Sequence, residues 1–520
     1  MSGAMEVDQE DGVFIQGSSL SQTNQTTTKR YLIVAVDDNR PFELESYIAN
    51  YTGRTAIDRL IHIVRICPSV APEAFQLAVN RIKRSRDPSL FQALVTAYDQ
   101  MNGNAGRQMP SSMSLGGIEP SWMEETNAKN QAERTKLEVE LKTYSNNMIK
   151  ESIRMAHRDL GNFYRATGEY ASAMKHLTKS REYCTTSQHI LDMCLSVVEL
   201  MMEHQNYANI TTYVFKAEAA LEAATSVHAH PPAGGNATSG TSAQSQATAA
   251  ATAKKRELEH VQTKLDLATA FAHLSQSNYE KAASYLLRLG PPKDLGDWVG
   301  KLFTPSDIAI YGALCALAGM SRGALKTQLE ESKNFGDYLE QEPYVRELLT
   351  AYMNSNFKTV LELLFRYSTR HYLDIHLSSH VQQLMDMIRN WAIVLYFQPF
   401  TTIRLDRMGV ALGWTVEETE KNVIALIQSG QIQGRIDSQN KILHAKQTDY
   451  RADLFARAMQ AGKEIQIANR KMLLRMKLQQ ADLVVKPPKH HHHSQYHHYQ
   501  QQQQQQQQMS YSMGDFMPGD

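Results

Sequence analysis

Apolar residues recur at three- and four-residue intervals along most of the chain, which is the spacing of an amphipathic α-helix. One such stripe consists of Leu137, Leu141, Tyr144 and Met148. Another lies in residues 53–67, where the expected core face consists of Ile57, Leu60, Ile61 and Val64. The two-residue alternation of a half-buried β-strand is scarce before residue 430. The pattern therefore predicts a mainly α-helical protein.

Three segments have too few large apolar side chains to form a core. Residues 1–30 are polar and rich in Ser, Thr and Gln, and residues 225–253 are mostly small and polar. Residues 484–520 contain a histidine cluster and nine consecutive glutamines. Such compositions cannot bury enough apolar surface to offset the entropy lost on ordering. We therefore expect a disordered N-terminus, a flexible insertion and a disordered His/Gln-rich tail.

Residues 157–180 resemble a tetratricopeptide unit, in which small residues let two helices approach and large residues fill the groove between them. The matching packing positions are Leu160, Gly161, Tyr164, Gly168, Tyr170, Ala173 and Leu177. Tyr207 and Tyr279 recur in similar settings between helical runs. The match is looser beyond the first unit. We therefore predict a degenerate, TPR-like helical-repeat solenoid over residues 131–300, with a concave surface suited to a protein partner.

Residues 390–446 have the outline of a winged helix. The first predicted helix has apolar positions at Ile403, Leu405, Met408 and Leu412. After a turn, Thr415 begins a second helix in a capping box with Glu418, and Gly430 ends it. The expected buried stripe of that second helix is Val416, Val423, Leu426 and Ile427. Two short strands, QIQGRID and NKILHA, follow around a turn at residues 437–440 and would form the wing.

Many winged helices read DNA, but the charges of the second helix argue against that use here. Its first two turns carry three glutamates within residues 417–420 and a single Lys421, so phosphate would be repelled. The wing offers only a weak basic pair, Arg435 and Lys441. We predict a protein-docking module, with an ordinary solvated face and nucleic-acid binding as the two alternatives.

The last predicted helix, residues 447–483, carries a heptad-like apolar seam. The seam consists of Leu454, Ala458, Ala461, Ile465, Ala468 and Met472. Near the end of the helix the apolar surface widens through Leu473, Leu474, Met476 and Leu478. One seam could pack on the rest of this chain, but a wide apolar end favours more than one helical neighbour, as in a helix bundle.

Charge and cysteine content exclude several classes of protein. Lys and Arg number 54, as do Asp and Glu, so no overall field attracts polyanions. The four cysteines form no CxxC pair, which argues against a disulfide framework or a cysteine zinc site. The acidic N-terminus lacks the apolar core of a signal peptide, and no run of about 18 apolar residues occurs. We expect a soluble intracellular protein without a membrane span.

No catalytic or metal-binding pattern emerges from the sequence. The one H-x-H, at residues 228–230, lies in the predicted insertion, far from the next aspartate, Asp266, that could complete a zinc site. His376 and His380 could share a helix face but have no third ligand, so a structural pair is favoured. The histidines of residues 490–498 fit a low-complexity tract better than a metal site. We expect no enzyme activity, no cofactor and no bound metal.

Helical repeats that lead into a winged helix and a terminal helix resemble PCI-domain proteins, the scaffold subunits of the proteasome lid, the COP-nine signalosome and translation initiation factor three. Three stretches carry a close resemblance to the family of signalosome subunit one: YIANYTGRTAIDRLIHIVRICP, RDLGNFYRATGEYASAMKHL and ALGWTVEETEKNVIALIQSGQIQGRID. The first is the most specific, because the sibling proteasome-lid subunit would share mainly the other two. The likeness covers about residues 31–480, interrupted at 225–253.

This resemblance implies a non-catalytic scaffold that assembles with other PCI subunits and with an MPN metalloprotease subunit. In the signalosome, that subunit holds the zinc site that removes NEDD8 from cullins, which regulates cullin-RING ubiquitin ligases. Family members join through their winged-helix edges, and their C-terminal helices form a common bundle. We expect the protein in the nucleus and the cytoplasm. A proteasome-lid scaffold and a nucleic-acid-binding PCI protein remain the alternatives.

The predicted segments are a disordered N-terminus (1–30), an N-terminal helical segment (31–130), the repeats (131–300), the helical part of a PCI domain (301–389), a winged helix (390–446), a C-terminal bundle helix (447–483) and the tail (484–520). The candidate partner interface comprises Trp414, Glu417, Lys421, Gln431, Gln433, Arg435, Ile465, Met472, Leu473 and Met476.

Overall fold

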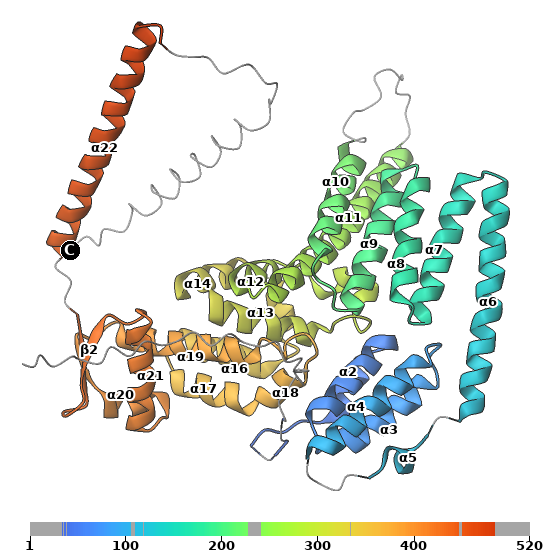
Figure 1. Cartoon of the computed structure of the whole chain (residues 1–520), viewed down its shortest axis with the longest axis horizontal. Helices are drawn as coiled ribbons and strands as arrows, with labels where there is room; N and C mark the ends of the chain where they lie inside the picture. The colour runs from blue at the N-terminus through green and yellow to red at the C-terminus, as the bar shows by residue number, and fades with distance from the viewer. Residues whose placement is uncertain are drawn as a thin grey trace, which may run out of the picture. The chain divides into compact units, whose positions relative to one another are not determined.

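The structure is a computed structural model that describes residues 34, 36–37, 39–105, 110–117, 119–226, 241–332, 334–446 and 450–483. The chain divides into a large unit, Met1–Ala445, and a second unit, Lys446–Asp520, and each is described by itself. Helices dominate both units, as the periodicity predicted (Figure 1). The predicted disordered ends, residues 1–30 and 484–520, lie outside the described residues.

The N-terminal helices form a hydrophobic cluster of their own. They are α1 (Leu44–Ala49), α2 (Gly53–Ile66), α3 (Ala71–Ile82), α4 (Ser89–Ala105) and α5 (Ser112–Leu115). On α2 the predicted core face is buried, with Ile57, Leu60, Ile61 and Val64 each at most 5% exposed. Ala56, Arg59 and Ile63 are buried on a second face of the same helix, so α2 has neighbours on two sides.

Antiparallel helix pairs follow. The elements are α6 (Pro120–Asn146), α7 (Lys150–Ala166), α8 (Tyr170–Lys179), the 3₁₀ turn η1 (Ser180–Tyr183), α9 (Ser187–Glu203), α10 (Ile210–Ser226), α11 (Thr241–Ser275), α12 (Tyr279–Leu287) and the 3₁₀ segment η2 (Pro292–Trp298). Helix α7 packs on α8, α9 on α10 and α11 on α12, and Figure 1 shows α7 to α10 side by side. This is the solenoid of helical pairs that the tetratricopeptide-like unit predicted.

The predicted flexible insertion, residues 225–253, needs a correction at both ends. Residues 225–226 belong to α10, and α11 already begins at Thr241. The sequence ATAAATA at residues 247–253 explains the early start, because alanine has the highest helix propensity and the run continues into an amphipathic helix. A segment with few large side chains can therefore extend a neighbouring helix. Residues 227–240 lie outside the described residues.

A second group of helices connects the repeats to the winged helix. It comprises α13 (Pro305–Gly319), α14 (Arg322–Glu331), α15 (Phe335–Leu339), α16 (Pro343–Met353), α17 (Phe357–Arg366), α18 (Ser368–Leu373) and α19 (Val381–Phe397). Helix α13 is buried on all sides from Asp307 to Ala318. It begins with a complete capping box, in which Thr304 and Asp307 exchange hydrogen bonds. A continuous hydrophobic core extends from the repeats through these helices to the winged helix.

The winged helix contains β1 (Thr402–Arg404), α20 (Leu405–Leu412), α21 (Val416–Gln428), β2 (Gly434–Asp437) and β3 (Ile442–Ala445). The three strands form an antiparallel sheet in the order β1-β3-β2. Thr415 accepts a hydrogen bond from the backbone N–H of Glu418, and Gly430 has the left-handed φ of 76° that a helix C-terminus favours. Val423 and Leu426 are buried, and Val416 and Ile427 pack against the core.

One part of the winged-helix prediction was wrong. Ile403 was assigned to the first helix, but it lies in β1, opposite Leu443 of β3. Its two-residue spacing from Leu405 is that of a strand, because residues two apart do not share a helix face, whereas Leu405, Met408 and Leu412 keep the helical spacing. Strand β1 is defined by its pairing with residues about forty positions later, which a local pattern does not contain.

The described residues of the second unit form a long helix, α22 (Tyr450–Gln480), within the range predicted for the C-terminal helix. Among the described residues, no helix is long and apolar enough to cross a membrane.

Candidate functional site

The open edge of the small sheet is the first candidate surface. Strand β2 pairs with β3 on one side only, through Arg435 opposite His444 and Ile436 opposite Leu443. Its other side has no strand partner among the described residues, so it can accept a further strand or another chain. The predicted interface residues Gln431, Gln433 and Arg435 are exposed at or just before this strand.

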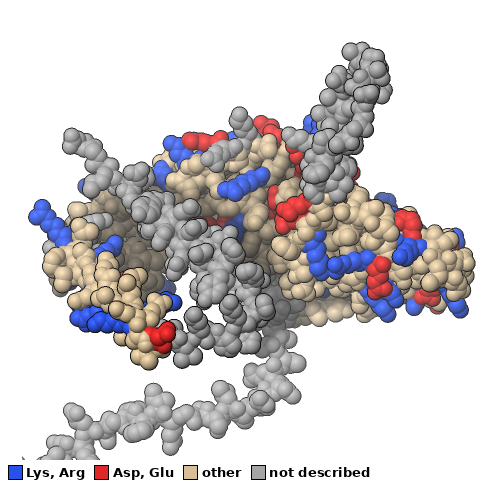
Figure 2. Space-filling view, turned by 90° about the horizontal axis from the view of Figure 1, so that it is seen from above, with Lys and Arg blue, Asp and Glu red and all other residues tan. Residues whose placement is uncertain are grey.

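The charges beside this edge are partly paired within the domain. Lys441 donates to the Glu420 carboxylate at 2.6 Å, and that hydrogen bond is the main cause of the lowered pKa of Glu420. One member of the weak basic pair of the wing is thus neutralised locally, which leaves Arg435. Glu417 and Lys421 are exposed on α21. Figure 2 shows positive and negative side chains interspersed on the visible face, without the continuous basic stripe that duplex binding requires.

Trp414 lies where α20 turns into α21. Its side chain is half-buried, packs against the main hydrophobic core and lies 5.9 Å from the Arg389 guanidinium. Its backbone N–H donates to the carbonyl of Gly409 at 2.8 Å, which fixes the turn. Trp414 therefore has a packing role, and part of its ring is left at the surface.

Helix α22, taken by itself, exposes a set of large apolar side chains. Exposed fractions are 69% for Leu454, 62% for Ile465, 65% for Met472, 58% for Leu473 and 58% for Met476. The predicted interface residues of this helix thus lie on its accessible surface. An apolar stripe of this length is typical of a helix that packs on other helices.

The predicted repeat-packing residues lie at the junction of α7 and α8. Leu160, Tyr164, Ala173 and Leu177 are buried, and Tyr170 is half-buried. A Cβ on Gly161 would lie 2.7 Å from the side chain of Leu177, so only glycine permits this close approach. Gly168 has a φ of 84°, which favours glycine at the turn between the two helices.

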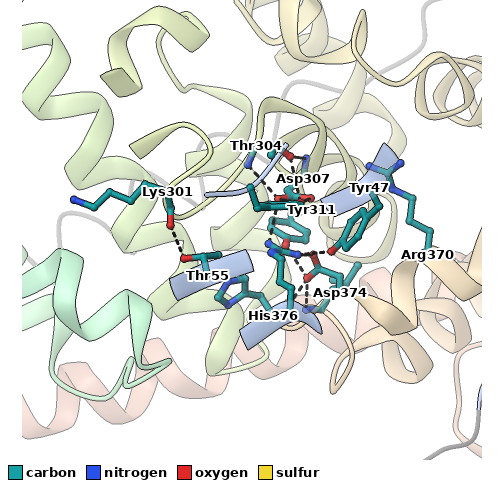
Figure 3. Close-up of polar contacts among 12 residues, drawn as sticks. Tyr47, Thr55, Lys301, Thr304, Asp307, Tyr311, Arg370, Asp374 and His376 are labelled. Atoms are coloured by element: carbon teal, nitrogen blue, oxygen red, sulfur yellow. Dashed lines mark hydrogen bonds and ion pairs between the residues drawn. The ribbon is translucent and has the colours of Figure 1, made fainter. Parts of the chain in front are cut away.

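Sequence reasoning missed a buried ionic network that joins α2 to the helices before the winged helix (Figure 3). Arg59 is fully buried, and its guanidinium lies 2.6 Å from Asp374 and 3.2 Å from Asp307. It also donates to the Tyr47 hydroxyl at 2.5 Å and lies 4.1 Å from the centre of the Tyr51 ring. Residues more than 240 positions apart in the sequence are thus held at one point.

Each carboxylate of this network has further donors. Asp307 accepts from the Tyr51 hydroxyl at 2.6 Å and from the backbone N–H of Thr304 at 3.1 Å. Asp374 accepts from the Tyr311 hydroxyl at 2.7 Å and from the backbone N–H of Leu377 at 2.9 Å. Buried charges are stable only when their hydrogen bonds are satisfied in this way.

The two carboxylates differ in their electrostatics. Burial raises the pKa of Asp307, and the attraction of Arg59 offsets this only in part. Burial acts in the same direction on Asp374, but Arg59 and the hydrogen bonds from Arg59 and Tyr311 hold the pKa of Asp374 below its usual range. Arg59 therefore has its strongest ion pair with Asp374.

The signal for this network was present in the stretch YIANYTGRTAIDR. Tyr47, Tyr51 and Arg59 are polar residues inside an otherwise apolar amphipathic region. Read alone, they fit a solvated helix face equally well. Their partners, Asp307 and Asp374, belong to segments with no local connection to this stretch, so the sequence did not reveal the pairing.

His376 and His380 each contact a tyrosine hydroxyl of the repeats, which agrees with the structural pair that the sequence favoured. The Tyr207 hydroxyl lies 2.5 Å from Nδ1 of His376, and the Tyr279 hydroxyl lies 3.2 Å from Nδ1 of His380. These are the two tyrosines that recur along the repeats. The residues form turns before α19, so they do not share a helix face. Burial lowers the pKa of His376 to about 3, which keeps its imidazole neutral.

Among the described residues, no group of three or more His, Cys, Asp and Glu side chains could hold a metal ion. The H-x-H of residues 228–230 and the histidines of residues 490–498 lie outside them. The open edge of the sheet and the apolar surface of α22 are features to which other proteins bind.

Comparison with known proteins identifies the family. Two family models match, one described as 26S proteasome subunit RPN7 over residues 119–328 and one as PCI domain over residues 340–447. The chain is 34% identical over 477 residues to the COP9 signalosome complex subunit 1 of Arabidopsis thaliana, a match that covers 91% of this chain and 97% of that relative. The chain belongs to the COP9 signalosome subunit 1 family.

Other relatives agree with this assignment. Subunit 1b of the Drosophila melanogaster COP9 signalosome complex is 29% identical over 505 residues, 90% of each chain. The 26S proteasome non-ATPase regulatory subunit 6 of Caenorhabditis elegans is 24% identical over only 37% of this chain. The predicted resemblance to the signalosome subunit 1 family is thus confirmed over the proteasome-lid alternative, and the protein is a signalosome PCI scaffold subunit.

Proposed function

We propose that this chain is a non-catalytic scaffold that supports the removal of NEDD8 from cullins and so regulates cullin-RING ubiquitin ligases. Its partners are the other PCI subunits and an MPN metalloprotease subunit, which carries the catalysis. The complex acts in the nucleus and the cytoplasm. The observation that supports this proposal most directly is the apolar seam of α22, which is exposed along the helix.

Free energy favours covering this seam. Burying one Ile or Met side chain stabilises an interface by roughly 1.5–3 kcal/mol. Of the six seam positions, Leu454, Ile465 and Met472 carry large apolar side chains, and the other three are alanines, which contribute less. A bundle with the C-terminal helices of partner subunits would supply the missing contacts.

The test compares two double variants of α22 in cells. Ile465→Gln with Met472→Gln places polar side chains in the seam, whereas Lys463→Gln with Arg470→Gln places the same residue on the opposite side of the helix. Glutamine is a good helix former, so both variants keep the helix. Each protein is purified by affinity, and the bound subunits are identified and quantified by mass spectrometry.

We expect the seam variant to lose about 100-fold in affinity for its partner subunits, from two lost contacts of at least about 1.5 kcal/mol each. The control variant should retain them. Cullin deneddylation by the purified complex should fall in parallel with subunit content. Equal recovery of partners by both variants would contradict the bundle, and partners without an MPN metalloprotease would contradict the proposed function.

The sheet edge is tested in the same way. The double variant Lys421→Glu with Arg435→Glu reverses the two exposed cations that we assign to the winged-helix interface. Arg407→Glu reverses an exposed cation on α20, outside that set. If a partner binds at this edge, only the double variant should lose PCI subunits. It should still retain the subunits that bind through α22.

A further inference from the structure

A cleft of about 1080 Å³ lies between the N-terminal helices and the helical repeats, and no residue of the sheet edge lines it. One wall is the start of α2, from Thr52 to Arg54, and the second is residues 80–87 at the end of α3. The third wall is formed by the end of α7 with Glu203 of α9. This volume is slightly above the range typical of ligand pockets, about 300–1,000 Å³.

The lining of the cleft is basic. Six of its side chains are cationic, namely Arg54, Arg81, Arg84, Arg86, Arg165 and Lys301, whereas two are acidic, Asp87 and Glu203. Three of the cations have acidic partners in or behind the walls: Arg54 pairs with Asp87, and Arg165 and Lys301 pair with Glu199. These three charges are largely balanced within the protein.

The other three cations form one rim, within the sequence RIKRSR of residues 81–86. Arg81 donates to the backbone carbonyls of Tyr51 and Ile48, which orient its guanidinium without neutralising its charge. Arg84 is exposed and has no ion pair among the described residues. Within the described part of the chain, Arg86 pairs only with Glu133, which is 43% exposed, and such pairs are weak. This rim can therefore bind an anionic partner.

We propose that the acidic segment Glu6–Asp11 of this same chain binds in the cleft. The segment reads EVDQED, four carboxylates in six residues, and it lies outside the described residues. Its charge is opposite to that of the arginine rim. The inference goes beyond the scaffold function and does not depend on it.

The length of the chain permits this contact. The backbone N–H of Val34 donates to the carbonyl of Ile66 at 3.0 Å, which fixes the start of the described chain at the C-terminal end of α2. The cleft lies at the other end of this 14-residue helix, about 20 Å away. Residues 12–33 connect the acidic segment to Val34 and can span roughly 70 Å when extended. A tether of this length keeps the segment at high effective concentration near the cleft.

The test measures competition between this segment and an added copy. A fluorescein-labelled peptide of residues 1–14 is titrated by fluorescence anisotropy against the full-length chain. It is also titrated against a neutral-tail chain with Glu6→Gln, Asp8→Asn, Glu10→Gln and Asp11→Asn. The wild-type cleft should be occupied by its own segment. We therefore expect the neutral-tail chain to bind the peptide at least about tenfold tighter than the wild type.

Two variants of the neutral-tail chain, each with one charge reversed, locate the binding site. Arg84→Glu, on the rim, should weaken peptide binding about tenfold, because one attraction becomes a repulsion. Lys83→Glu is the matched control, since Lys83 is exposed beside Arg84 but does not line the cleft. It should change binding by less than about threefold at physiological salt, where distant surface charges are screened. Both residues are exposed, so thermal midpoints should be unchanged.

Three results would overturn the proposal. Equal weakening by Arg84→Glu and Lys83→Glu would mean general charge attraction without a site. An absence of peptide binding by the neutral-tail chain would exclude acidic peptides from the cleft. Equal binding by the wild-type and neutral-tail chains, with loss in Arg84→Glu, would mean that the cleft takes an acidic segment of another protein instead of its own.

Discussion

The Arg59 network and the seam of α22 differ in where the side chains of a helix find their contacts. Arg59 lies on α2, and its charge is matched inside the chain by Asp307 and Asp374, with all three side chains at most 6% exposed. The seam of α22 has apolar side chains that are more than half exposed, such as Ile465 and Met472. Arg59 finds all its ionic partners within the described residues of this chain, whereas the exposed seam can be buried by partner subunits. Variants in the first should therefore change folding, and variants in the second should change assembly.

The largest expected effect comes from Arg59→Met, which leaves two buried carboxylates without their cation. Removing one partner of a buried ion pair costs about 3–5 kcal/mol, because the remaining charge stays desolvated. We expect the urea midpoint of the purified subunit to fall accordingly. In Arg59→Met with Asp307→Asn and Asp374→Asn, no charge remains unpaired, so part of the loss should be recovered.

Arg86→Met is the matched control for this prediction. Its ion pair with Glu133 has a similar distance, 2.8 Å, but both side chains are exposed. Exposed pairs contribute about 0–1 kcal/mol, so the midpoint should barely move. Similar losses of stability for Arg59→Met and Arg86→Met would contradict the prediction that a buried ion pair costs more to break than an exposed one.

A smaller effect is expected where the repeat helices meet. Gly161→Ala would place a Cβ 2.7 Å from Leu177, and the resulting overpacking should cost about 1–3 kcal/mol in the free energy of unfolding. Gly462→Ala on α22 meets nothing within 4 Å and removes a poor helix former. Its circular dichroism should show equal or greater helix content. A loss of stability in Gly462→Ala would contradict the open surroundings of Gly462, because it would mean that the added methyl group clashes with another part of the protein.

Lowering the pH should reduce the free energy of unfolding through the buried histidines near the Arg59 network. Burial lowers the pKa of His62 to about 4 and those of His371 and His376 to about 3. Between these values and the unfolded value of about 6.5, the unfolded chain binds more protons, so the free energy of unfolding falls as the pH drops through this window. Asp58, whose pKa burial raises to about 6, acts in the opposite sense between pH about 4 and 6.

Urea midpoints at pH 7.5, 6.5 and 5.5 would measure this dependence. A midpoint that is constant over this range would contradict the burial of the three imidazoles.

The smallest effect on folding should come from the seam itself. Ile465→Gln with Met472→Gln should change the free energy of unfolding of the isolated subunit, measured by urea denaturation, by less than about 0.5 kcal/mol, as is usual for exposed positions. The same variant is expected to lose its partner subunits. A large loss of stability in the isolated chain would mean that the seam is already packed within it.

Local patterns in the sequence determined most of the elements. The periodicity of Ile57, Leu60, Ile61 and Val64 identified one face of α2, and Thr415 and Gly430 marked the two ends of α21. These features depend on residues within a few positions of one another, where propensity, capping and amphipathicity act. The exposed apolar positions of α22 were also identified from spacing alone.

Tertiary structure decided the features that depend on distant residues. Strand β1 exists because Ile403 meets Leu443, and the second buried face of α2 exists because Arg59 meets Asp307 and Asp374. A single sequence contains no information on which of 54 basic side chains will be buried opposite which carboxylates. Such a pair is stable in the interior only when hydrogen bonds surround its charges. The donors to these carboxylates, such as the Tyr51 and Tyr311 hydroxyls and the backbone N–H of Leu377, come together only in three dimensions.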